Sequence, residues 1–141
     1  GITNEMVRTA PPLLMVMNDL LNFLGPLPMI VGHNVTFDIG FLQAKAKECG
    51  FGSSDERLAY HRAFCTKVLA QKQLPGLPSY EGIVVATQIG YHNPNPHRAE
   101  ADVRMSSAIL FEFIKRLQSE HTLKQNTVAG LLEYQGLLQA R

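Results

Sequence analysis

The sequence predicts one α/β domain with parallel strands, and three observations support this. The chain has 141 residues, which suits a single domain and is enough to bury a core without disulfides or a metal. Apolar residues make up 45% and charged residues 18%, a balance that excludes a disordered or collagen-like chain. Short apolar segments at residues 29–31 and 63–66 alternate with helical patterns, as strands do in parallel α/β sheets.

The first part of the chain predicts two helices. Residues 4–8 can form a short helical turn. Over residues 13–24 leucines and methionine recur at helical spacing, and Pro12 stands at the start of this segment, where proline is tolerated. Gly25 follows it, and glycine is the residue type that suits the position after a helix end.

The middle of the chain continues the alternation. The apolar, β-branched segment 29–31 predicts a buried strand, and the helical pattern over 35–48 that follows it is ended by Gly50. Residues 63–66 predict a second strand, and residues 68–73 a short helix. A sheet of two strands leaves unpaired edges, and it is small for the helices that it should carry.

The last part predicts three helices. The first begins at a Ser79 cap and ends near residue 89. Residues 91–96 hold two prolines and two asparagines, which indicates an ordered loop or a lid. The longest helix covers 98–119, and Thr127 can cap a last helix that ends near Leu138. We expect the core stripe of the longest helix to consist of Ala101, Met105, Ala108, Ile109, Phe111, Ile114 and Leu117.

Charge and cysteine content limit the class of protein. Thirteen basic and twelve acidic residues give a net charge of +1, so the chain is no polybasic nucleic-acid binder held by charge alone. Cys49 and Cys65 make neither a disulfide framework nor a CxxC motif, and reduced thiols in a cytoplasmic protein are the expectation. The apolar runs are far shorter than the roughly 18 residues of a membrane span, and no signal peptide is visible, so we expect no membrane partner.

Polar residues follow the first predicted strand directly. His33 and Asn34 come after it, and Asp38 lies in the first turn of the next helix, between Phe37 and Phe41. In open α/β folds ligands bind beyond the carboxyl ends of the strands, and a carboxylate there can hold a divalent cation. A structural interpretation stays open, because an acid favours a helix N-terminus and the asparagine can simply cap the helix.

A second polar group opens the longest predicted helix. His97 precedes this helix, and Asp102 lies one turn into it, on the same face as Met105 and Ile109. A buried acid is costly unless it is paired or binds a metal. The imidazole can reach a water held by such a metal, and the ordinary pKa of histidine, about 6.5, suits a general base. The alternative is an N-terminal acid beside a surface histidine.

Together the two segments resemble the second and third motifs of the DEDDh 3′–5′ exonucleases. The matching stretches are His33-Asn34-x-x-Phe37-Asp38-x-x-Phe41-Leu42 and His97-Arg98-Ala99-x-x-Asp102. The resemblance covers about residues 1–118, and the order and spacing of both motifs argue against a chance match. The type that the chain resembles most is the proofreading epsilon subunit of DNA polymerase III.

The resemblance implies an RNase H-like three-layer α/β fold and two-metal hydrolysis of phosphodiester bonds with Mg²⁺ or Mn²⁺. Asp38 and Asp102 match two of the family's four metal-binding carboxylates. His97 matches the residue that deprotonates the attacking water.

Four further residues are candidate substrate contacts: His33, Asn34, Phe37 and Arg98. From the residues alone, structural support is the favoured role of His33 and Asn34, and a solvated side chain is the favoured interpretation of Arg98. Packing in the core is the expected role of Phe37 and Phe41, and stacking on or wedging the terminal base is the alternative for both.

The family's first motif, Asp-x-Glu on the first strand, is absent from the chain. We expect it to lie upstream of Gly1 together with the first three strands of the fold, which would explain the small predicted sheet. Residues 1–120 would then be the C-terminal two-thirds of an exonuclease domain, and residues 121–141 a helical extension.

The main expectation is an enzyme that trims single-stranded DNA from its 3′ end, with a DNA polymerase subunit as candidate partner. Exonucleases of the RNase T or oligoribonuclease kind share these motifs, so RNA is an alternative substrate. Another alternative is a truncated, non-catalytic homologue that serves as an interaction module. The last predicted helix is amphipathic and can dock on a polymerase subunit, on a second copy as a homodimer, or on its own domain.

Overall fold

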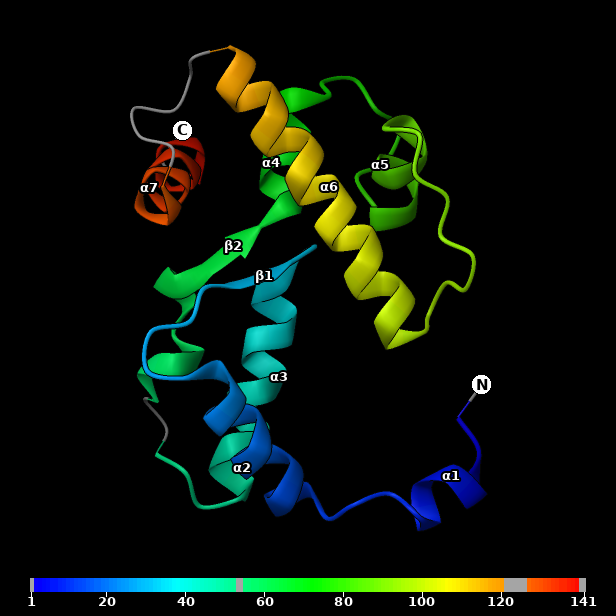
Figure 1. The fold of residues 1–141 in the computed structure, drawn as a ribbon, viewed down its shortest axis with the longest axis vertical. Helices are drawn as coiled ribbons and strands as arrows, with labels where there is room; N and C mark the ends of the chain where they lie inside the picture. Colours follow the sequence, from blue (N-terminus) through cyan, green and yellow to red (C-terminus); the bar gives the residue numbers. More distant parts are fainter. Residues whose placement is uncertain (1, 53–54, 121–126, 140–141) are drawn as a thin grey trace.

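The computed structural model describes residues 2–52, 55–120 and 127–139 (Figure 1). Its helices and strands follow the predicted order. They are α1 (Asn4–Arg8), α2 (Leu13–Leu24), β1 (Ile30–Gly32), α3 (Val35–Glu48), the 3-10 turns η1 (Glu56–Leu58) and η2 (Tyr60–Arg62), β2 (Ala63–Cys65), α4 (Thr66–Gln73), α5 (Gly82–Gln88), α6 (Ala99–Ser119) and α7 (Val128–Gln139).

The two strands pair in parallel, as the alternation of helices and strands predicts. Ile30 lies opposite Ala63, and Gly32 lies opposite Cys65. Helix α3 connects the strands and packs against both. Within the described residues the sheet has these two strands, so the prediction of an α/β domain with a small parallel sheet is confirmed.

Both faces of β2 are buried. Successive side chains of a strand point to opposite sides, so each face packs against a different set of residues. Ala63 and Cys65 pack with Val35 and Ile39 of α3. Phe64, which is fully buried, points to the other face, into the main core between the sheet and helices α4, α5, α6 and α7. The sheet therefore lies between α3 on one side and a helical layer on the other.

Helix α6 runs through the main core (Figure 1), and its buried stripe differs in part from the prediction. Phe111 is 64% exposed, whereas Phe113 is fully buried. The reason is that this helix buries every fourth residue, and a position two residues away points to the other side. The stripe consists of Ala101, Met105, Ile109, Phe113 and Leu117.

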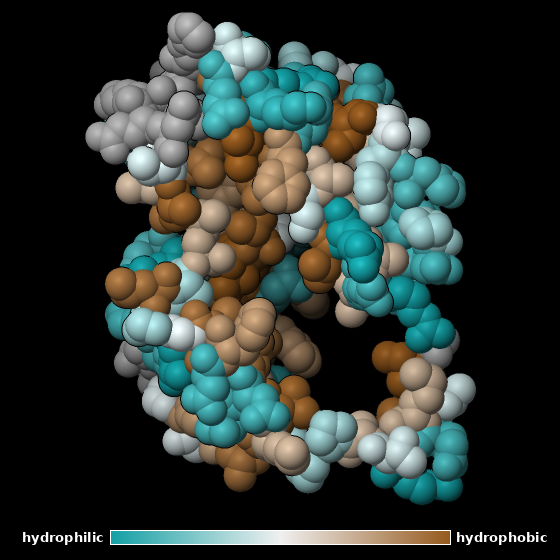
Figure 2. All heavy atoms as spheres, viewed as in Figure 1, coloured by the Kyte–Doolittle hydropathy of each residue, from teal (hydrophilic) through white to brown (hydrophobic). Residues whose placement is uncertain are grey.

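A second, smaller core lies between α2 and α3. Met17 and Leu21 of α2 pack there with Ala46 and Leu58. The first turn of α2 stays exposed, since α1 and the start of α2 form an arm that leaves the body of the molecule (Figure 1). Figure 2 shows open space between this arm and the rest of the molecule.

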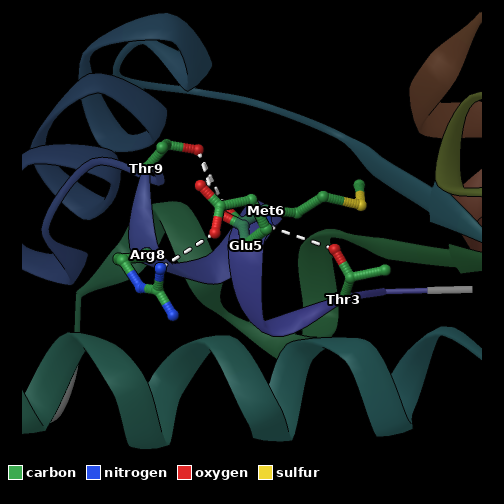
Figure 3. Close-up of polar contacts among 5 residues, drawn as sticks. All are labelled: Thr3, Glu5, Met6, Arg8 and Thr9. Atoms are coloured by element: carbon green, nitrogen blue, oxygen red, sulfur yellow. Dashed lines mark hydrogen bonds and ion pairs between the residues drawn. The ribbon is translucent and has the colours of Figure 1, made fainter.

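Helix α1 depends on local polar contacts, because it buries none of its side chains. The Met6 N–H donates to Thr3 Oγ1 at 3.3 Å and thereby caps the helix, and Arg8 pairs with Glu5 at 2.9 Å (Figure 3). The Thr9 hydroxyl closes the other end by donating to the Glu5 carbonyl at 3.3 Å. The predicted helical turn is confirmed.

The cap predicted for α5 is wrong by two residues. The helix begins at Gly82, and its N-cap is Glu81. The Ser79 hydroxyl accepts a hydrogen bond from the Glu81 N–H at 3.2 Å instead. This serine therefore closes a turn before the helix, an arrangement that competes with helix capping for the same side chain.

Helix α7 packs on its own domain, against α4 and β2. The Thr127 hydroxyl caps it, as predicted, by accepting the Gly130 N–H at 3.1 Å. Gln135, which is 7% exposed, accepts the Cys65 N–H and donates to the Ala63 carbonyl at 2.9 Å. One side chain thus makes the hydrogen bonds that a neighbouring strand would make along β2.

No helix in the described part of the chain is long and apolar enough to cross a membrane.

Candidate active site

The two predicted motifs meet at one pocket. Asp38, His97 and Asp102 all line a cavity of about 930 Å³. Its walls are the end of β1, the first turns of α3 and α5, the loop before α6, and α6 itself. Residues from α3, from α6 and from the loop before α6 therefore share one cavity beyond the carboxyl end of β1.

Asp38 is presented by the first turn of α3. The helix buries Val35 and Ile39 against the strands, and Asp38, on the exposed side, lines the pocket. Its N-cap, Asn34, has the left-handed backbone conformation (φ 69°) and makes no side-chain cap bond. Capping by the Asn34 amide is therefore not what starts α3.

Asp102 is presented by the first turn of α6 and is half-buried. The core stripe of α6 passes through the neighbouring Ala101 and Met105, so Asp102 lies at the edge of the apolar face on which it was predicted. Its Oδ1 accepts a hydrogen bond from Asn93 Nδ2 at 2.9 Å.

Asn93 is the site residue that sequence reasoning missed. It is 3% exposed, although it belongs to the polar loop between α5 and α6. Its Oδ1 accepts the Asn95 N–H at 3.0 Å, a turn that asparagine commonly forms with the backbone two residues on. The Asn-Pro-Asn pattern could have indicated this turn, but the bond to Asp102 is visible only in the folded chain.

His97 is exposed and lines the pocket from the end of this loop. Its φ of 65° places it in the left-handed region, and Asn34 is the other non-glycine residue with positive φ among the described residues. Asparagine and histidine are among the side chains that tolerate this conformation best. Each of the two helices that carry a pocket carboxylate is thus preceded by a left-handed residue.

His33 lines the pocket, but both of its ring nitrogens have hydrogen-bond partners within the protein. Its Nε2 lies 2.7 Å from the Tyr80 carbonyl and its Nδ1 lies 3.0 Å from the Thr66 hydroxyl. The carbonyl can only accept, so Nε2 carries the proton, and Nδ1 of the neutral ring then faces the Thr66 hydroxyl, which also lies 3.3 Å from the Gly32 carbonyl. Burial lowers the pKa of His33 and favours this neutral form. Both nitrogens are therefore used to join β1, α4 and the segment before α5.

The aromatic residues beside Asp38 are on the surface. Phe37 is 74% exposed and Phe41 is 57% exposed, so the expected packing in the core is wrong for both. The reason is that α3 turns its buried face, with Val35 and Ile39, toward the sheet. The Lys45 ammonium lies 5.7 Å from the centre of the Phe41 ring. Arg98 is exposed at the N-cap of α6, next to His97.

The pocket offers an incomplete set of metal ligands. Nowhere in the described residues do three His, Cys, Asp or Glu side chains gather closely enough to hold a metal ion. Asp38 and Asp102 supply carboxylate oxygens, the ligand type that Mg²⁺ and Mn²⁺ prefer. The two residues fit a divalent ion chemically, and further ligands are needed to hold it.

Comparison with known proteins decides the family. Residues 1–110 match the sequence profile of the RNase T exonuclease family. The chain belongs to this family of DnaQ-like 3′–5′ exonucleases. The resemblance of the two motifs to these exonucleases is thereby confirmed, and the site lies in a nuclease domain.

Relatives of this exonuclease domain include a 3′-5′ exonuclease and DNA polymerase III proteins. The 3′-5′ exonuclease DinG of Bacillus subtilis is 28% identical over 127 residues, which cover 89% of this chain and 13% of the relative. DNA polymerase III subunit epsilon of Aquifex aeolicus is 31% identical over 117 residues, or 83% of this chain and 55% of the relative. DNA polymerase III PolC-type of Oceanobacillus iheyensis is 30% identical over 83% of this chain and 8% of the relative. The exonuclease domain thus spans about half or less of these relatives, and no solved structure matches it significantly.

Proposed function

We propose that this chain is part of a metal-dependent 3′–5′ exonuclease that trims single-stranded DNA. The observation that carries the proposal is that Asp38, Asp102 and His97 line one pocket. The carboxylates of Asp38 and Asp102 and the imidazole of His97, in a cavity that Glu81 and His33 also line, suit phosphodiester hydrolysis, which needs an activated water and a stabilised leaving oxygen.

The proposed roles follow from the chemistry of each group. Asp38 and Asp102 would hold Mg²⁺ or Mn²⁺, and when bound these ions supply the activated water and stabilise the departing 3′-oxygen. His97, exposed on the pocket wall, would take the proton of the attacking water on its ring nitrogen. Phe37 would stack on a base, because its ring is exposed one residue from Asp38.

The remaining ligands are proposed to come from the family's Asp-x-Glu motif. In the RNase H-like three-layer fold that motif lies on the first strand, and we place it and the first three strands outside the residues of this chain. Two observations support this: the described sheet has two strands, and the described residues bring no third ligand together with Asp38 and Asp102. The helical layer over one face of the sheet and α3 over the other fit the same fold.

DNA is the proposed substrate, because relatives of the chain are subunits of DNA polymerase III. For the same reason a polymerase subunit in the cytoplasm is the proposed partner, and a proofreading role is the proposed task. RNA is the second candidate substrate, since the family profile that matches is that of RNase T. Labelled DNA and RNA strands of one sequence, offered to the same enzyme, separate the two.

The test uses the full-length protein and a 5′-labelled single strand with Mg²⁺ or Mn²⁺. Asp38→Asn and Asp102→Asn should abolish trimming, because each removes a metal ligand. His97→Ala should lower the rate by about 10²–10⁴ and leave strand binding unchanged. Glu100→Gln is the matched control, since Glu100 lies in the same turn as Asp102 but is exposed and paired with Arg104 at 2.9 Å.

Normal turnover by Asp102→Asn would overturn the proposal. If the wild-type protein binds metal but trims neither DNA nor RNA, the domain is an interaction module instead. Loss of strand binding in His97→Ala would make His97 a substrate contact rather than a base.

A further inference from the structure

Asn93 is a buried amide within an exposed loop. It is 3% exposed, while the flanking His92 and Pro94 are exposed. A buried amide is costly unless its donor and acceptor are both satisfied. Here the Asn93 amide donates to Asp102 Oδ1 at 2.9 Å and accepts the Asn95 N–H at 3.0 Å, so the loop is built around this side chain.

The orientation of the Asn93 amide follows from its neighbours. A backbone N–H can only donate, so the oxygen of the amide must face Asn95. The nitrogen then faces the Asp102 carboxylate, which accepts. The reversed orientation would set donor against donor and acceptor against acceptor. Asn93 Nδ2 also lies 3.7 Å from the sulfur of Met105, which holds it against the core stripe of α6.

The same side chain connects Asp102 to the segment that carries His97. Asn93 fixes the position of Asn95 through the backbone N–H. The Asn95 carbonyl in turn accepts the Arg98 N–H at 3.3 Å, and this second turn encloses His97 in its left-handed conformation. One buried amide therefore lies between the carboxylate and the histidine of the pocket.

We propose that Asn93 is a positioning residue of this exonuclease site, which orients the Asp102 carboxylate toward the metal and keeps His97 beside it. The inference rests on the proposed function. Residues that hydrogen-bond to a metal-binding carboxylate typically change metal affinity or activity by 10–100-fold when they are replaced. No role for Asn93 follows from the two motifs, since it lies outside both.

The test compares Asn93→Ser with Asn95→Ser in the full-length protein. Serine at position 93 can still accept the Asn95 N–H in a turn, but its side chain is too short to reach Asp102. The control makes the same chemical change in the same loop on an exposed side chain and keeps the backbone N–H of Asn95. Three quantities are measured: Mn²⁺ binding by titration, the rate of trimming a labelled DNA strand against Mn²⁺ concentration, and the thermal unfolding temperature.

We expect Asn93→Ser to raise the Mn²⁺ concentration for half-saturation by about 10–100-fold, with partial recovery of the rate at high Mn²⁺ and no change in the KM for the strand. The control should match the wild type. A lower unfolding temperature with unchanged Mn²⁺ dependence would overturn the inference, because Asn93 would then act on stability alone. If the wild type neither binds Mn²⁺ nor trims, the proposed function fails and this inference fails with it. If the wild type is active and both variants show the same Mn²⁺ dependence, the proposed function stands and only the positioning role of Asn93 is rejected.

Discussion

Gln135→Glu tests whether the helix α7 side chain replaces a strand at the edge of β2. The substitution keeps the length of the side chain and its acceptor for the Cys65 N–H. It replaces the amide N–H that donates to the Ala63 carbonyl with an oxygen. In the folded protein this oxygen faces another acceptor in a site that is 7% exposed.

The size of the effect follows from that contact. A buried carbonyl that loses its donor costs about 1–3 kcal/mol, and more when a charge is placed beside it. We therefore expect the free energy of unfolding to fall by about 2–3 kcal/mol at pH 7.5, a large part of the roughly 5–15 kcal/mol of a typical domain. Protonation supplies an O–H that can donate to Ala63, so the folded state binds this proton more tightly than the unfolded state does. The loss should accordingly shrink as the pH falls toward 5.

Urea denaturation followed by circular dichroism at both pH values measures this. Gln71→Glu is the matched control: it makes the same change on an exposed position of α4 and should stay within about 0.5 kcal/mol of the wild type. The reasoning is refuted if Gln135→Glu behaves like this control at pH 7.5, or if its deficit relative to the control does not shrink in acid.

Two further predictions concern the site. Burial lowers the pKa of His33, so the unfolded chain binds the proton more readily than the folded protein does. The contribution of His33 to the free energy of unfolding should therefore be fully present above about pH 6.5 and fall below it. His33→Gln should flatten that part of the pH profile measured by urea denaturation. An unchanged profile would show that another group controls it. Phe37→Ala should change stability by no more than about 0.5 kcal/mol, because the ring is 74% exposed, yet weaken binding of a fluorescent DNA strand by about 1–3 kcal/mol in the full-length protein. Phe23→Ala, on the 87% exposed ring of α2 that does not line the pocket, is its control, and equal affinities would remove Phe37 from the substrate path.

Local pattern was enough for most of the fold. The helix over Val35–Glu48 was predicted with the bounds that the structure has, because its ends are marked by a polar pair after a strand and by Gly50. Where several helical faces are apolar, pattern was not enough. Phe111 and Phe113 are equally apolar, and only the packing of α6 on the other helices decides which of them is buried.

The site divides in the same way. The sequence by itself determined that Asp38 and Asp102 begin two helices and that the motif residues belong to a nuclease, because both depend on residue types at short spacing. Only the tertiary structure decided that Asn93 hydrogen-bonds to Asp102, that both ring nitrogens of His33 have partners within the protein, and that Gln135 bonds to the edge of β2. These contacts are side-chain hydrogen bonds between separate segments, and their partners are set by how the helices, strands and loops pack, which no local periodicity encodes.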